Sequence, residues 1–387
     1  MKSTELAKEI TATMTLRLPG TTGKIANKMR YIDATAPKLI RGKVIRPIIQ
    51  GQFEKLRATG IACVSNKLPA FGGILYGAAA LRHDVTVIGN SVVDTYQDSR
   101  IDINDINYLQ TKQRLIWKEY LLVYKLLTDL FAESELPQLI LTDIPLLIGR
   151  GEQGSNLEEE DIKQEWNALM TVMTKFWEGN LSRIFPEDPD GPILVSVSRR
   201  HFGAVLNAIQ RSTSNASPEL IDPETLTLIK KEWDRLREAG IMRVLNSMLR
   251  SGKRTSAYYY DAFGPEVLRA QPKIISKYGL IGLHARVGIK TPVWQLETLG
   301  NRESGIWTTE EIDRMCSMIA YLTLYDNPKT FPLPLWYAKK LARLPRSILV
   351  NYMRETLRLL RDSTVDSAWL EGIDSFDDEN NMEGEIL

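Results

Sequence analysis

The stretch GIACVSNKLPAFGGILYGAAALR contains two apolar runs on either side of a short segment rich in turn residues. Residues 61–64 and 74–81 are predicted strands, and the intervening PAFGG predicts a tight connection between them. A third run, DVTVIGN at 84–90, predicts another short strand. Three sequential strands with tight connections form an antiparallel meander, which needs further layers to cover its apolar faces.

Helical periodicity alternates with short apolar runs along the rest of the chain. Residues 103–132 carry a broad apolar stripe, which predicts a long helix. Asp222 as N-cap, Pro223 at the first helical position and Gly240 as a stop predict a helix between them. Further helices are expected at 37–58, 158–185, 199–212, 308–325 and in TFPLPLWYAKKLARLP, where Lys339 and Lys340 are expected near the helix start. Further strands are expected in PQLILTDIPLL, DGPILVSVS, LIGLHARVG and PVWQLET.

These elements predict an α/β fold in which helices flank both faces of a mixed sheet. The run around LILT is short and apolar, as expected of a strand buried on both faces, and DGPILVSVS is expected to be another buried strand. We divide the 387 residues into an N-terminal helical segment (1–59), a main α/β domain (60–362) and an acidic, disordered tail (363–387). No run of eighteen apolar residues and no signal peptide is found, so a cytoplasmic protein without membrane contact is expected.

The net charge of +1 conceals an uneven distribution of charge. Residues 366–387 contain eight acidic residues and no Lys or Arg. Residues 1–365 therefore contain 40 acidic and 49 basic residues, which gives them a net charge of +9. A basic body suits a nucleic-acid partner. The tail is open to three interpretations: a docking peptide, a mimic of phosphate, or a solubilising segment. Two cysteines and three histidines, far apart in sequence, predict neither a disulfide framework nor a zinc site.

Asp143 follows a buried run directly, and the ends of such strands carry the sites of open α/β sheets. Together with a second carboxylate it has the chemistry to hold a divalent cation. Glu119, in the middle of the long predicted helix, is the candidate partner. The alternatives are a turn aspartate at Asp143 and an exposed helical glutamate at Glu119, paired with Lys118 or Arg114.

Two basic segments are candidate contacts for nucleic acid. Arg199 and Arg200 occupy a strand-to-helix junction, where guanidinium groups and helix-start amides favour phosphate. The segment RSGKRTSAYYYD is expected to be a flexible loop, in which Lys253 and Arg254 stand beside three tyrosines. Cations interleaved with aromatic rings suit backbone contact and base stacking, although a solvated loop beside core tyrosines is equally consistent. No GxxxxGK[ST] or GxGxxG motif is present, so ATP hydrolysis by this chain is not expected.

Taken in order, these pieces resemble the NurA nuclease family over about residues 60–360. The matching segments are IACVSNKLPAFGGILYGAAAL, a helix with a glutamate, LILTDIPLL, ILVSVSRR, PVWQLE with Glu297, and FPLPLWYAKKLA. The resemblance implies an RNase H-like mixed sheet flanked by helices. It also implies a homodimer that binds DNA and a HerA-type hexameric ATPase, with Mn or Mg as the cofactor of an active enzyme.

The departures from the family pattern fall on its active site. The family's first metal-binding aspartate corresponds to Ser65, and its histidine corresponds to Lys339. Its tyrosine falls near Thr330 or Phe331. Asp143 remains, and Glu119 remains unless the matching position is Gln113. An ammonium about 4 Å from a divalent ion costs on the order of 8 kcal/mol at an effective dielectric of 20, so Lys339 is expected to pair with Asp143 or a DNA phosphate.

Three hypotheses follow. The first is a NurA-like DNA-processing subunit with a degenerate nuclease site, which binds DNA and the ATPase and serves as a structural, DNA-guiding or regulatory subunit. The second is an active metal-dependent DNA nuclease, in which Asp143 and Glu119 work with Asp94, Asp98 or Glu297. The third is a non-enzymatic adaptor that recruits a partner through its acidic tail. DNA repair and defence against foreign DNA both remain open as pathways.

Overall fold

The computed structural model describes residues 2–361, except 72, 90, 147, 149–158, 199–203, 213–215, 264–278, 301–306 and 325–329. The acidic tail at 363–387 therefore lies outside the described residues. No helix in this described part combines the length and the apolar character that crossing a membrane requires.

A ten-stranded mixed sheet forms the centre of the molecule. Its strands are β1 (Ile45–Pro47), β2 (Lys55–Ala70), β3 (Gly73–Ile88), β4 (Ser91–Ile106), β5 (Leu139–Thr142), β6 (Ile193–Ser198), β7 (Lys253–Thr255), β8 (Tyr258–Tyr259), β9 (Leu280–Arg286) and β10 (Trp294–Leu299). They lie in the order β1-β7-β9-β10-β6-β5-β2-β3-β4, and β8 pairs with β9 beside this path.

The helices precede, follow and connect these strands. They are α1 (Lys2–Arg41), α2 (Thr111–Phe131), α3 (Glu160–Asn180), α4 (Val205–Arg211), α5 (Pro223–Lys231), α6 (Trp233–Ala239), α7 (Ile241–Met248), α9 (Thr309–Leu324), α10 (Leu333–Leu341) and α11 (Arg346–Arg361). Short 3₁₀ turns cover Leu181–Arg183 and Tyr260–Phe263.

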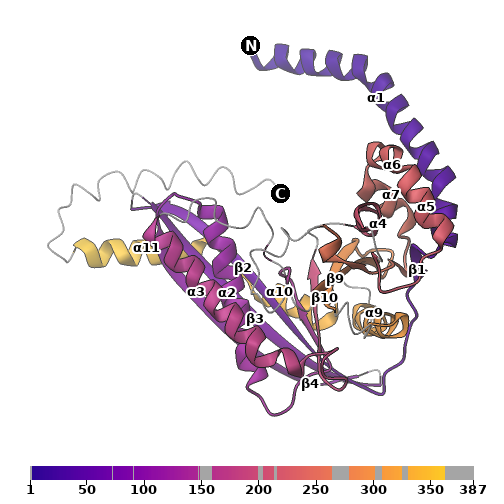
Figure 1. Cartoon of the computed structure of the whole chain (residues 1–387). Coiled ribbons are helices and arrows are strands. Elements are labelled where there is room, and N and C mark those ends of the chain that lie inside the picture. The colour runs from indigo at the N-terminus through magenta and orange to yellow at the C-terminus, as the bar shows by residue number, and fades with distance from the viewer. Residues whose placement is uncertain are drawn as a thin grey trace.

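The first half of the sheet has RNase H-like topology. β2, β3 and β4 form the predicted antiparallel meander, β5 pairs parallel with β2, and β6 pairs parallel with β5. Helices α2 and α3 provide the crossovers before and after β5 and lie side by side on one face (Figure 1). β10 and β9 then extend the sheet in antiparallel fashion. The sequence prediction of an α/β fold with a mixed, helix-flanked sheet is confirmed.

Two apolar cores lie on opposite faces of the sheet. Trp117 on α2, Trp177 on α3 and Ile140 on β5 belong to the core of the first face. Leu141, the next residue of β5, belongs to the second core with residues of α9 and α10. The alternation along β5 explains why Leu139, Ile140 and Leu141 are all apolar, because successive side chains enter different cores. A smaller cluster joins α11 to the far ends of β2 and β3 (Figure 1).

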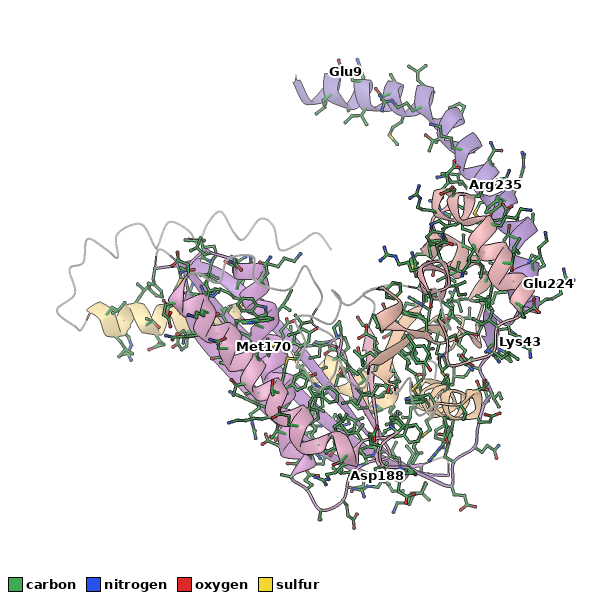
Figure 2. All side chains as sticks on the ribbon, viewed as in Figure 1. Glu9, Lys43, Met170, Asp188, Glu224 and Arg235 are labelled. Atoms are coloured by element: carbon green, nitrogen blue, oxygen red, sulfur yellow. The ribbon has the colours of Figure 1, made fainter. Side chains whose placement is uncertain are left out.

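Helix α1 is the most extended element. Its C-terminal part packs against α6 and α7, while its first half projects away from the rest of the chain (Figure 1). Figure 2 shows Glu9 on this projecting half and Arg235 of α6 where the helix meets the body.

Several predicted boundaries near the N-terminus are wrong. No helix covers 37–58: α1 ends at Arg41, Lys43 has a positive φ of 63°, and β1 and β2 follow. The division at 59/60 falls inside β2, and β1 belongs to the same sheet, so residues 1–59 are not a separate helical segment. Residues 84–88 continue β3, and the third strand of the meander is β4.

The remaining elements follow the sequence prediction with smaller changes. The helix expected from 103 begins at Thr111, because 103–106 still belong to β4. Asp222 caps α5 by accepting a hydrogen bond from the Thr225 N–H at 3.1 Å, but the helix breaks at Glu232, so α5 and α6 are separate. Lys339 and Lys340 lie in the last turn of α10 rather than near its start.

Candidate functional site

Asp143 lies immediately after β5, beside the neighbouring strand β2. Its backbone N–H donates to the Ile61 carbonyl at 3.2 Å, which continues the β2–β5 ladder by one residue. Its carboxylate accepts the Cys63 N–H at 3.1 Å through Oδ1. The ladder and this hydrogen bond fix the carboxylate at the end of a strand that is buried on both faces.

Helix α10 brings Lys339 to this carboxylate. The first turn of α10 packs directly on β2 at Gly60, where a Cβ atom would lie 2.3 Å from the Leu335 nitrogen. Only glycine permits so close an approach of two backbones. From the last turn of α10, Lys339 Nζ reaches Asp143 Oδ2 at 2.6 Å, as the sequence analysis expected. Nζ also lies 5.1 Å from the centre of the Phe331 ring.

Ser65 and Glu119 form the second contact of the site. Ser65 is two residues beyond Cys63 on β2, so both side chains leave the same face of the sheet. The Ser65 hydroxyl donates to Glu119 Oε1 of α2 at 2.7 Å. Of the two candidate positions on α2, it is therefore Glu119 rather than Gln113 that contacts Ser65.

Cys63 contacts Asp143 and lies two residues from Ser65 on β2, between the two contacts of the site. Burial, followed by the negative charges of Asp143 and Glu119, raises the pKa of the Cys63 thiol well above its usual value, and the Lys339 charge opposes the shift. Cys63 Sγ lies 3.6 Å from Asp143 Oδ1. The sequence analysis gave the cysteines no role beyond excluding a disulfide framework and a zinc site. The position of Cys63 two residues before Ser65 on a strand was the available signal of its place in the site.

The donor set does not fit a divalent metal ion. One carboxylate oxygen of Asp143 holds an ammonium and the other accepts a backbone N–H. A divalent ion needs several anionic oxygens, and a cation beside it adds repulsion. Among the described residues, no group of three or more His, Cys, Asp or Glu is arranged to hold a metal.

The three other carboxylates considered from sequence have different surroundings. Glu297 on β10 is fully buried, accepts the Tyr260 hydroxyl at 2.5 Å and accepts the Leu146 N–H at 3.0 Å. Asp98 on β4 pairs with Arg100 at 3.1 Å. Asp94 lies on β4 beside the charged cavity of about 630 Å³ that Arg82, Asp84 and Glu133 help to line.

The structure corrects part of the predicted basic surface. Arg254 lies on β7 rather than in a flexible loop, and its guanidinium is fully buried between Glu219 at 2.7 Å and Asp313 at 2.7 Å. Its N–H groups donate to these two carboxylates and to the Thr255 carbonyl, which leaves no donor for a phosphate. The nearby tyrosines Tyr258, Tyr259 and Tyr260 are buried too, so they offer no stacking platform. Lys253 is partly exposed, and Arg199 and Arg200 lie outside the described residues.

Comparison with known proteins identifies the fold. No family model and no curated protein sequence matches this chain. The NurA nuclease from Sulfolobus solfataricus superposes with a TM-score of 0.53 at 14% identity, covering 88% of this chain and 97% of that one. A second NurA structure gives 0.47 at 11% identity over 96% and 99% of the two chains, and NurA bound to dAMP and manganese gives 0.44 at 11% over 92% and 99%. The chain therefore has a NurA-like nuclease fold.

Proposed function

We propose that this chain is a NurA-like DNA-processing subunit whose nuclease site is degenerate and which binds DNA and a HerA-type hexameric ATPase. Asp143 and Glu119 are the remnants of the acidic cluster, and Ser65 and Lys339 are its replacements. As a homodimer on the ATPase, the subunit would guide DNA rather than cut it. The nuclease fold and the net charge of +9 on residues 1–365 support DNA as the ligand.

The observation that carries the proposal is the ion pair between Lys339 Nζ and Asp143 Oδ2 at 2.6 Å. Metal-dependent phosphodiester cleavage uses cations to activate water and to stabilise the leaving oxygen. A lysine ammonium neutralises a carboxylate but has no open coordination position for water. The pair therefore preserves the charge balance of the site without its chemistry.

An active Mn- or Mg-dependent nuclease is the second candidate, and it is supported by the contacts of Asp143 with Cys63 and of Glu119 with Ser65, two residues apart on β2. The deciding experiment is a cleavage assay on labelled linear DNA with each metal. The protein is tested alone, with its candidate ATPase, and as Asp143→Ala. The proposal expects DNA binding without cleavage in every combination, whereas cutting that disappears in Asp143→Ala refutes it.

A metal-binding measurement tests the same point without relying on activity. The wild-type chain is expected to leave the Mn²⁺ electron paramagnetic resonance signal unchanged. The double variant Ser65→Asp, Lys339→His restores the residue types of the family pattern and is expected to bind the ion. The matched control Ser65→Asp, Lys340→His keeps the first change and moves the histidine by one residue, away from Asp143. Tight Mn²⁺ binding by the wild-type chain would contradict the degenerate site.

A further inference from the structure

The last turn of α10, the following connection and the first residue of α11 carry a group of exposed cations, here named the α10–α11 surface. Its cations are Lys340, Arg343 and Arg346, all of which are exposed. Within the described part of the chain, no carboxylate pairs with any of these three. Lys340 instead lies 5.0 Å from the centre of the Trp336 ring.

Further along α11, a separate strip carries three large exposed apolar residues. Ile348, Tyr352 and Leu359 of α11 are 41%, 44% and 62% exposed. The opposite side of α11 is the one that packs on the sheet, where its residues join the small cluster with β2 and β3. At 100° per residue these three exposed positions fall within a narrow sector of the helix. Arg346 lies about 160° from Ile348 around the helix, so this apolar strip is separate from the cations. A ligand that contacts both the cations and the strip combines negative charge with apolar groups.

The C-terminal segment 366–387 has this composition. Its eight acidic residues are interleaved with apolar ones, including Trp369, Ile373 and Phe376. A DNA backbone supplies the negative charge but not the apolar side chains. The segment therefore offers negative charge to the cations and apolar side chains to the neighbouring strip of α11, and it belongs to the same chain.

The connection also permits the contact. The segment 362–387 directly follows α11, so its anchor lies at the end of α11 away from the cations. A flexible chain of this length has a root-mean-square span of roughly 25–30 Å. The sixteen residues of α11 are about 24 Å long, so the tail reaches the cations at the other end. Tethering at such a distance gives an effective concentration in the millimolar range.

We propose that segment 366–387 binds the α10–α11 surface of its own chain and competes there with the DNA backbone. The competition with DNA rests on the proposed function, whereas the binding of the segment does not. The tail then acts as an internal competitor that weakens DNA binding until DNA at high local concentration, as on a translocating ATPase, displaces it.

The first test measures the segment directly. A fluorescein-labelled peptide of residues 366–387 is added to the full chain in which all eight acidic tail residues are changed to Asn or Gln. Fluorescence anisotropy is expected to show saturable binding that is lost in the triple variant Lys340→Glu, Arg343→Glu, Arg346→Glu. Arg235→Glu with Arg237→Glu on α6 is the control and is expected to bind like the unchanged surface. No binding, or equal loss in both variants, overturns the proposal.

The second test measures competition. The neutralised-tail chain is expected to bind a labelled DNA duplex about tenfold more tightly than the wild-type chain, from a millimolar effective concentration acting on a weak contact. Equal DNA affinities overturn the competition. If neither chain binds DNA, the proposed function fails, while the peptide measurement still decides whether the tail binds this surface.

Discussion

The Lys339–Asp143 pair gives the most direct prediction, because its energy depends on whether the lysine acts as a structural cation. The nitrogen and oxygen are 2.6 Å apart, and the carboxylate side chain is 6% exposed while that of the lysine is 37% exposed. Exposed pairs contribute about 0.2–1 kcal/mol, and removing one partner of a buried pair costs about 3–5 kcal/mol. The lysine is partly open to solvent, so screening places the energy of this pair between the two ranges, closer to that of exposed pairs. We expect a coupling free energy of about 1.5 kcal/mol.

A double-mutant cycle with Lys339→Met and Asp143→Asn measures this coupling. Both changes nearly preserve side-chain size, so the cycle reports the charge interaction rather than a cavity. Unfolding in urea is followed by tryptophan fluorescence at low salt and in 1 M NaCl. We expect the coupling to fall only in part at 1 M, where the Debye length of about 3 Å exceeds the separation of the two atoms. A coupling below about 0.3 kcal/mol would refute the idea that Lys339 replaces a cation.

Three further predictions concern the fold that supports the site. Gly60→Ala is expected to destabilise the protein by about 2–3 kcal/mol in urea unfolding, because the new Cβ meets the backbone of Leu335. Arg254→Ala is expected to cost about 3–5 kcal/mol by the same measurement, since the fully buried Glu219 loses its closest cation. Burial lowers the pKa of His83 below 6.5, so the unfolded chain binds more protons at acid pH. Stability should therefore be complete above pH 6.5 and decline as the pH falls below it, and His83→Gln should flatten this decline in a series of unfolding curves.

The elements that were predicted best are those whose side chains are almost all buried, because burial makes their sequences mostly apolar. The runs of β5 and β6 are buried at every position and mostly apolar, and both strands appear where expected. Asp143 could be placed from sequence because the end of such a strand is a fixed location in the fold. Local pattern and tertiary environment agree in these segments, which is why the sequence sufficed.

The failures arose where a long-range contact determines the structure. Gly60 resembles a helix stop in sequence, yet in the structure it lies inside β2, where its missing side chain admits α10. Strand β4 is an exposed edge strand with many polar residues, so its length could not be predicted from apolar residues. The charge of Arg254 suggested solvent, but its partners Glu219 and Asp313 are 35 and 59 residues away in sequence. No local pattern reports such partners.

The pairing of Lys339 also bears on where DNA would run. Lys339 already neutralises Asp143, so a phosphate approaching this lysine meets a carboxylate 2.6 Å from its ammonium. One residue further along, Lys340 lies 5.0 Å from the centre of the Trp336 ring, and Arg343 and Arg346 are exposed. Phosphate contacts position a duplex through accessible cations. We therefore expect DNA phosphates to contact these three residues rather than Lys339, which is the arrangement that the proposed binding without cleavage requires.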